Sequence, residues 1–272
     1  MRSFASDNNS GVHPLVMDAL QRANEDHALG YGSDKWTDEA VAMLKESFAP
    51  ACESLFVFNG TGSNIVALQL MVRPFHSIIC AETAHIYVDE CGSPVKNTGA
   101  QIRPVLTPDG KLTPELIRPY LHGFGDQHHS QPGAIYLSQC TELGTVYTPV
   151  ELKALTSLAH EHGMYVHMDG ARIANACAYL KTSLKQITAD CGIDVLSFGG
   201  TKNGLMMGEC VVIFNEELKA SAAFVRKQSA QLASKMRYLS CQFTAYLTDH
   251  LWLKNAERAN AMAQRLCDAL KQ

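Results

Sequence analysis

Several features that mark other classes of protein are missing from this sequence of 272 residues. No apolar run approaches the roughly 18 residues of a membrane span. There is no block of lysine or arginine and the formal net charge is −4, which argues against nucleic acid or a membrane surface as the main partner. The first eleven residues contain no apolar signal-peptide core, so we expect a cytoplasmic protein without a secretory leader.

Disulfide and metal frameworks are missing as well. The nine cysteines are scattered, odd in number and without a CxxC pair, which is typical of reduced core cysteines in a cytosolic protein. His128 and His129 adjoin in a polar loop, but no third ligand is in sight. We therefore predict no metal site.

The second half of the chain alternates strands with helices. Apolar runs at 134–137, 165–168 and 193–196 predict strands, and a capping box from Thr148 to Glu151 opens a helix that ends at Gly163. This order predicts an α/β fold with a mainly parallel central sheet and helices on both faces, in three layers. Ligands of such sheets lie outside the carboxyl ends of the strands.

A strand, a turn of small residues and a helix suggest an anion cradle near residue 60. An apolar strand at 55–58 runs into Gly60-Thr61-Gly62-Ser63-Asn64, and a helix follows. Backbone N–H groups and the positive end of the helix dipole converge on an anion at such a turn. No GK[ST] follows and position 65 is Ile, so it is neither a P-loop nor a dinucleotide fingerprint. The alternative is an ordinary helix start capped by Thr61 or Ser63.

Lys202 stands in a glycine-rich connection, Ser197 to Gly204, between two apolar runs at 193–196 and 211–214. A lysine that forms an imine needs close approach of the backbone, which glycine permits. The alternative is a solvated lysine on a turn.

The cradle, His85 after a strand at 77–80, Asp169 at a strand end and Lys202, 33 positions later, fall at one edge of the predicted sheet. Pyridoxal phosphate requires these parts: donors for its phosphate, a lysine for its aldehyde, a carboxylate for its pyridine nitrogen and a flat side chain on its ring.

These residues carry a resemblance. The sequence resembles the threonine aldolases within the β-eliminating-lyase group of fold-type-I pyridoxal-phosphate enzymes. The segments that match are Ser6-Asp7, Gly60 to Asn64, Ala84 to Tyr87 with Glu90, His167-Met168-Asp169-Gly170-Ala171-Arg172, Ser197 to Gly204, and Met236-Arg237.

The resemblance implies which residues hold the cofactor. Lys202 is the Schiff-base lysine, Asp169 pairs with the pyridinium and His85 stacks on the ring. The full set of cofactor contacts is Gly60, Thr61, Gly62, His85, Asp169, Arg172, Lys202 and Arg237, of which the three cradle residues and Arg237 face the phosphate.

For the substrate, the resemblance implies that Arg172 binds the amino acid carboxylate, with Ser6 nearby. Tyr31 approaches from a neighbouring subunit, and His129, or else His128, is a second active-site histidine. The family's reaction is retro-aldol cleavage of L-threonine or L-allo-threonine to glycine and acetaldehyde. The base for the β-hydroxyl stays open between His85, His129 and a water.

Two alternatives remain: another pyridoxal-phosphate lyase or transferase of the same fold, or a shortened, weakly active homologue kept for binding or assembly. The resemblance implies a tetramer of dimers with shared active sites.

We expect a large cofactor-binding domain at 1–240, with an N-terminal arm at 1–14. Helical periodicity predicts a long amphipathic helix from about residue 245. The resemblance implies a small C-terminal domain after the large one, so we expect 241–272 to be its start and the domain to be incomplete.

Overall fold

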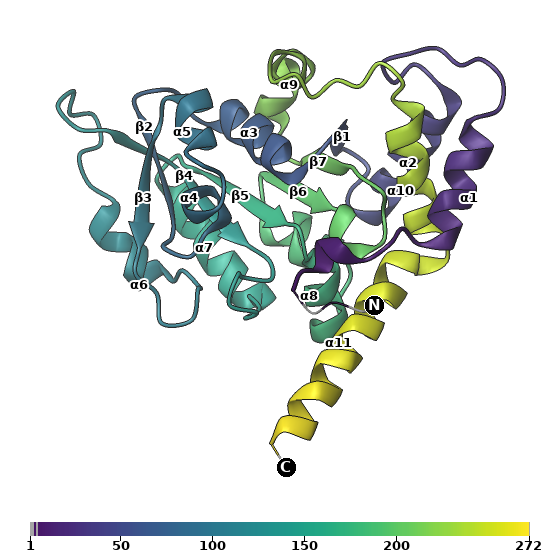
Figure 1. The fold of residues 1–272 in the computed structure, drawn as a ribbon. Helices are drawn as coiled ribbons and strands as arrows, with labels where there is room; N and C mark the ends of the chain where they lie inside the picture. Colours follow the sequence, from purple (N-terminus) through teal and green to yellow (C-terminus); the bar gives the residue numbers. More distant parts are fainter. Residues whose placement is uncertain (1–2, 4, 272) are drawn as a thin grey trace.

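The computed structural model describes residue 3 and residues 5–271, which fold around one central sheet (Figure 1). Seven strands lie in the order β1-β7-β6-β5-β4-β2-β3. Their bounds are Glu53–Val57 (β1), His76–Ala81 (β2), Gln101–Val105 (β3), Gln131–Ser138 (β4), Tyr165–Gly170 (β5), Val195–Gly199 (β6) and Glu209–Ile213 (β7).

All strands but one run in the same direction. Strand β7 is antiparallel to both of its neighbours, β1 and β6, whereas the other pairs are parallel. The start of β7 at Glu209 therefore lies beside the ends of β1 at Val57 and of β6 at Gly199. One edge of the sheet thus gathers the carboxyl ends of six strands and the beginning of the seventh, which is where such folds bind ligands.

Helices cover both faces of the sheet. The α-helices are Pro14–Ala23 (α1), Lys35–Ser47 (α2), Gly60–Met71 (α3), His85–Val88 (α4), Ser93–Thr98 (α5), Pro114–Ile117 (α6), Pro149–Glu161 (α7), Ile173–Leu180 (α8), Glu216–Gln228 (α9), Arg237–Leu247 (α10) and Leu251–Leu270 (α11). Short 3-10 helices include Asp7–Asn9 (η1), Thr201–Asn203 (η5) and Thr248–His250 (η6). One apolar core lies between the sheet and α3 and α9, and a larger one between the sheet and α1, α2, α7, α8 and α10. The predicted three-layer arrangement is confirmed.

Local signals in the sequence place most elements correctly. The capping box at Thr148 and Glu151 opens α7, with both of its hydrogen bonds present. Strand β3 escaped prediction because it contains Arg103 and Pro104 and is only partly buried, as an edge strand can be. Helix α3 begins at Gly60, earlier than predicted, because Asn59 and not Thr61 or Ser63 caps it.

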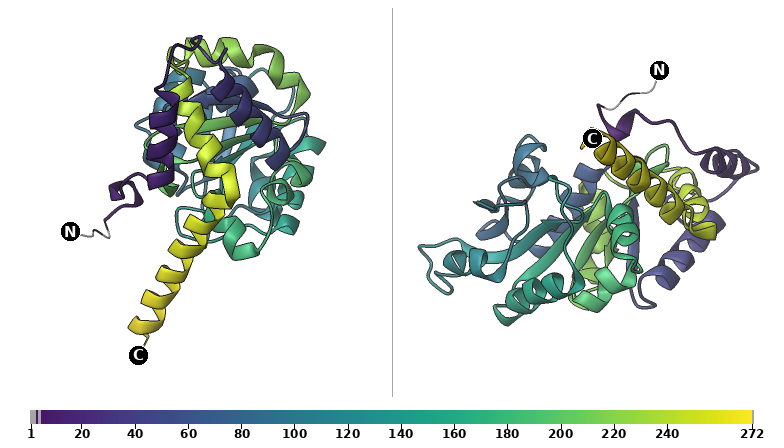
Figure 2. Two further views of the ribbon diagram at one scale, coloured as in Figure 1. Left: turned by 90° about the vertical axis from the view of Figure 1, so that its right-hand side faces the viewer. Right: turned by 90° about the horizontal axis from the view of Figure 1, so that it is seen from below.

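The C-terminal helical pattern is two helices and not one. Asp249 and His250 adopt left-handed backbone angles, with φ of 51° and 55°, and separate α10 from α11. The first turns of α11 bury Leu251 and Trp252, while its later turns are exposed and extend away from the body (Figures 1 and 2). The predicted domain boundary after residue 240 falls inside α10, which packs on α1 and α2; the division itself stays a prediction.

None of the helices in the described residues is both long enough and apolar enough to cross a membrane. Within the same residues, no group of three or more His, Cys, Asp or Glu side chains is arranged to hold a metal ion.

Gly199 and Gly200 serve chain packing in this fold. A Cβ atom on Gly199 would lie 2.6 Å from the Cα of Ala171, and one on Gly200 would lie 2.3 Å from Leu205 Cδ1. The end of β6 therefore comes close to the residue after β5 because position 199 has no side chain.

We predict that Gly199→Ala lowers the free energy of unfolding by about 1–3 kcal/mol, because rigid backbone atoms must move to admit the new methyl group. Urea denaturation of the cofactor-free protein measures this. Gly11→Ala is the control, since no atom lies within 4 Å of its added Cβ. Equal stability of the two variants would contradict the packing role.

Candidate active site

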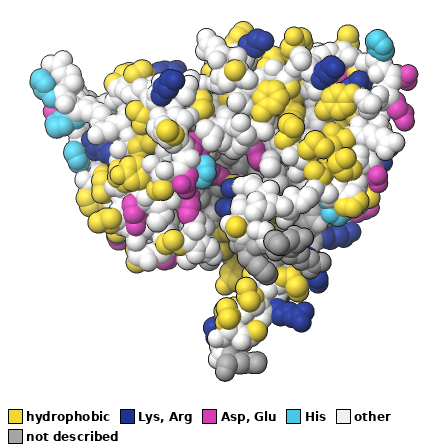
Figure 3. All heavy atoms as spheres, viewed as in Figure 1, with side chains coloured by type: hydrophobic (Ala, Val, Ile, Leu, Met, Phe, Trp, Pro, Cys, Tyr) yellow, Lys and Arg dark blue, Asp and Glu magenta, His cyan; other side chains and the backbone are white. Residues whose placement is uncertain are grey.

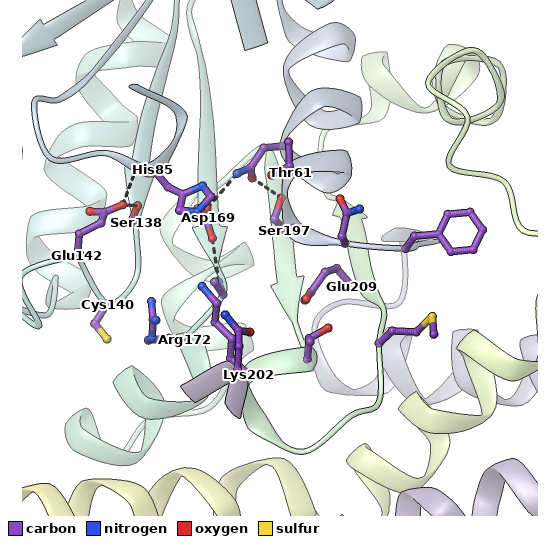
Figure 4. Close-up of a pocket in the computed structure, with 18 residues that line it drawn as sticks. Thr61, His85, Ser138, Cys140, Glu142, Asp169, Arg172, Ser197, Lys202 and Glu209 are labelled. Atoms are coloured by element: carbon purple, nitrogen blue, oxygen red, sulfur yellow. Dashed lines mark hydrogen bonds between the residues drawn. The ribbon is translucent and has the colours of Figure 1, made fainter. Parts of the chain in front are cut away.

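A cavity of about 380 Å³ opens at the carboxyl edge of the sheet and contains most of the residues that the sequence singled out. Six of them line it: Gly60, Thr61, His85, Asp169, Arg172 and Lys202. They come from the start of α3, the start of α4, the end of β5, the residue before α8 and η5. Figure 4 shows His85, Asp169 and Thr61 on one side of the cavity and Arg172 and Lys202 on the other; Figure 3 shows the hollow in the face of the molecule.

Asp169 is buried at the end of β5, and its carboxylate is held by three hydrogen bonds. Tyr136 Oη donates to Oδ2 at 2.6 Å, Asn64 Nδ2 donates to the same oxygen at 3.0 Å, and the N–H of Ala171 donates to Oδ1 at 2.9 Å. Burial alone raises the pKa of a carboxyl group, but these donors outweigh it, and the pKa of Asp169 is lowered. Asp169 is therefore an anion inside the protein, as a partner for a pyridinium must be.

A second layer of polar side chains supports Asp169. Ser197 Oγ donates to Asn64 Oδ1 at 3.0 Å and lies 3.0 Å from His167 Nε2. Burial lowers the pKa of His167 to about 4, so its imidazole is neutral at physiological pH. Asn64 and His167 lie in motifs that match the family, but neither was predicted to have a role in the site.

His85 is tied to two carboxylates. Its Nδ1 lies 2.8 Å from Glu90 Oε1, and its backbone N–H donates to Glu142 Oε1 at 2.9 Å. The hydrogen bond to Glu90 raises the pKa of His85, although partial burial opposes that shift. Glu90 Oε1 also accepts from Asn64 at 2.8 Å, so His85 and Asp169 share one network. The sequence offered no signal for Glu142.

The start of α3 leaves donors free for an anion. The Asn59 side chain accepts from the N–H of Gly62 at 2.7 Å, and its carbonyl accepts from Ser63. Within the described part of the chain, no hydrogen bond involves the N–H groups of Gly60 and Thr61. Gly62 itself lies beneath the Gln231 side chain, where a Cβ atom would clash. The free N–H groups of the predicted cradle are thus those of Gly60 and Thr61.

Lys202 stands on a turn held from several sides. Asn203 Nδ2 donates to Tyr246 Oη at 2.7 Å and to the carbonyl of Trp252 at 2.8 Å, which ties η5 to α10 and α11. Glu209 Oε2 accepts from the N–H of Gly200 at 2.7 Å. Burial raises the pKa of Glu209 to about 7. The sequence did not single out Glu209, which also lines the cavity.

Besides Gly62, four predicted residues do not line the cavity of their own chain. His129 precedes β4, at the amino end of that strand, and pairs with Asp126 at 3.4 Å; the cavity lies at the opposite, carboxyl edge. Its neighbour His128 is in the same loop. Ser6 caps η1, with its Oγ accepting from Asn8.

The other two are Tyr31 and Arg237. Tyr31 is exposed, has a left-handed φ of 61°, and stacks under Lys227 Nζ at 5.6 Å. Arg237 donates to the carbonyl oxygens of Glu25 and Asp26.

Comparison with known proteins decides the family. Residues 3–272 match the beta-eliminating lyase family. A low specificity L-threonine aldolase of Pseudomonas aeruginosa is 43% identical over 268 residues, which is 98% of this chain and 78% of that protein. The chain belongs to the beta-eliminating lyase family. The resemblance to threonine aldolases that the motifs indicated is thereby confirmed.

The solved structures agree with this membership. A threonine aldolase of Leishmania major superposes with a TM-score of 0.95 at 32% identity, over all of this chain and 79% of that one. An aspartate aminotransferase of Thermus thermophilus superposes at 0.69 with 17% identity, over 94% of this chain and 67% of that one, and shows the shared fold. The beta-eliminating lyase member described here thus has the predicted fold-type-I architecture of pyridoxal-phosphate enzymes.

The lowered pKa of His167 leads us to predict how the stability of this lyase-family protein depends on pH. Its pKa of about 4 lies below the ordinary value of 6.5, so the unfolded chain binds the extra proton first as pH falls. The stabilisation is present above pH 6.5 and is lost progressively toward pH 4. Between pH 7 and pH 5 we expect His167 to account for a loss of about 2 kcal/mol.

Urea denaturation of the cofactor-free wild type and of His167→Gln at both pH values measures the difference. The variant is less stable at pH 7 but loses less stability on acidification. An identical pH dependence in both proteins contradicts the assignment.

Proposed function

We propose that this chain is a pyridoxal-phosphate-dependent aldolase that cleaves L-threonine, L-allo-threonine and related β-hydroxy-α-amino acids to glycine and an aldehyde such as acetaldehyde. The observation that carries the proposal is the buried, hydrogen-bonded anion of Asp169 in one cavity with Lys202 and the free donors of α3. The relatives named threonine aldolases in the comparisons supply the substrate class.

The residues of the cavity fit this cofactor. Gly60 and Thr61 would hold its phosphate with N–H groups that α3 leaves free, Asp169 would neutralise its ring nitrogen, and His85 would face the ring. Lys202 is the amine that would carry it. When bound, the cofactor supplies an electron sink for the bond that breaks at Cα.

The chain's own task is to orient the substrate and to take a proton. Arg172 would bind the α-carboxylate, since its guanidinium group lines the cavity. We assign the β-hydroxyl proton to Nε2 of His85, because Nδ1 is engaged by Glu90. His129 of the same chain lies at the other edge of the sheet and does not compete for this role.

The proposed assembly is a homotetramer built from dimers that share active sites. Support comes from Tyr31 and Arg237, two predicted site residues that lie outside the cavity of their own chain. Tyr31 is 57% exposed despite its size and is held in a left-handed conformation, which costs of order 1 kcal/mol or more. A cytoplasmic location is proposed on the nine free cysteines.

We expect the purified chain with added cofactor to absorb visible light and to release acetaldehyde and glycine from L-threonine and L-allo-threonine. Lys202→Ala loses the visible band and about 10³-fold or more of the activity, because the cofactor loses its attachment. Lys153→Ala, on an exposed face of α7, is the control and keeps both. Pyruvate and ammonia in place of acetaldehyde indicate a β-eliminating enzyme, and a colourless wild type contradicts any pyridoxal-phosphate function.

The pH dependence of kcat/KM tests the base. An imidazole accepts a proton only when neutral, and the pKa of His85 is raised, so the acid limb lies above the ordinary value of 6.5. Glu90→Gln removes the charge that raises it and shifts this limb to lower pH. Asp89→Asn, an exposed neighbour, leaves the limb in place. If the acid limb of kcat/KM does not shift in Glu90→Gln, a group other than His85 accepts the proton.

A further inference from the structure

Arg172 is held from outside the cavity by a residue of the N-terminal arm. Its Nε donates to Asp7 Oδ2 at 2.7 Å, and the two side chains are 39% and 34% exposed. Within the described part of the chain, no hydrogen bond involves the two terminal amino groups of Arg172. Arg172 lines the cavity, on the same side as Cys140 in Figure 4.

The arm that carries Asp7 is itself tied down. Asp7 opens η1, whose first turn is closed by Ser6 Oγ accepting from the N–H of Asn8. Helix η1 lies against η5, the turn of Lys202, and Asn8 lines the cavity. Further along, the N–H of His13 donates to the carbonyl of Gly204 at 2.9 Å. Asp7 is thus held next to the turn that carries Lys202 (Figure 1).

A guanidinium group is planar, and its five N–H donors point along fixed directions in that plane. When Nε is engaged by one carboxylate, the two terminal amino groups still form a fork that can take a second carboxylate through two parallel hydrogen bonds. Orientation of that fork costs rotamer entropy unless another contact has already fixed the side chain.

We propose that Asp7 is a positioning residue for the substrate: it holds Arg172 by Nε and leaves the terminal amino groups free to bind the α-carboxylate of the amino acid. This rests on the proposed function for the identity of the substrate. Asp7 also balances the charge of Arg172 while no substrate is bound. Ser6, which the family resemblance places near the carboxylate, supports this role because it caps η1, the helix that begins at Asp7.

The contact between Asp7 and Arg172 allows a second role, in which Asp7 competes with the substrate carboxylate for Arg172. If the Asp7 carboxylate occupied the place of the substrate carboxylate, removing its charge would strengthen substrate binding. Because Asp7 engages Nε and not the terminal fork, the geometry favours positioning over occupation.

The test is binding of glycine to the cofactor-loaded protein by titration calorimetry. Glycine has the amine and carboxylate of the substrate but no bond to cleave. Asp7→Asn keeps an acceptor oxygen and removes the charge, and we expect about 3- to 10-fold weaker glycine binding, a modest effect because the pair is partly exposed. Asp18→Asn, the same change at an exposed site on α1, stays within twofold of wild type.

Glycinamide is the matched ligand, because it lacks the carboxylate; its binding should not differ between wild type and Asp7→Asn. With L-threonine, KM should rise in Asp7→Asn by a similar factor while kcat changes less than twofold. Hydrogen exchange of a peptide covering residues 6–12 verifies that the arm stays in place. If exchange shows that the arm has detached, Asp7→Glu, which retains the charge, must bind glycine more tightly than Asp7→Asn.

Unchanged or tighter glycine binding in Asp7→Asn overturns the proposal, and so does an equal loss for glycinamide. These results are separable from the proposed function. Acetaldehyde release with unaltered glycine binding rejects the role of Asp7 alone. Weaker glycine binding in a protein that cleaves no β-hydroxy amino acid rejects the aldolase reaction alone.

Discussion

The buried charge of Asp169 is the constraint on which the site depends. An ionised carboxylate inside a protein is costly unless donors replace its water. Here the donors come from three places: Tyr136 on β4, Asn64 on α3 and the backbone after β5. The sheet register and the position of α3 must therefore both be correct for the charge to be tolerated.

The same network reaches the other functional groups. Asn64 donates to both Asp169 and Glu90, and Glu90 in turn holds His85. One amide thus connects Asp169, which we propose neutralises the ring nitrogen of the cofactor, with His85, which we propose faces the ring. Hydrogen bonds in such buried chains strengthen one another, and partial satisfaction is costly.

Lys202 depends on parts of the chain that are far away in sequence. Its turn is anchored to α10 and α11 through Asn203 and is covered by η1. The packed end of α11 is therefore part of the support of the site. The N-terminal arm contacts the Lys202 turn through η1 and holds Arg172 through Asp7, so it connects two parts of the cavity lining.

The sequence by itself determined the alternation of strands and helices and the family, because periodicity and short motifs are local properties. It also singled out Lys202, Asp169, His85 and Arg172, which the fold brings to one cavity. The tertiary structure decided which distant residues contact these motifs, because a short motif does not specify its long-range neighbours. The partners of Asp169, 33 and 105 residues away, became neighbours only through the sheet and α3. The edge strand β3, with Arg103 and Pro104, became a strand only by pairing with β2. His129 resembles an active-site histidine in sequence, yet it lies at the amino end of its strand, and only the direction of the strand shows this.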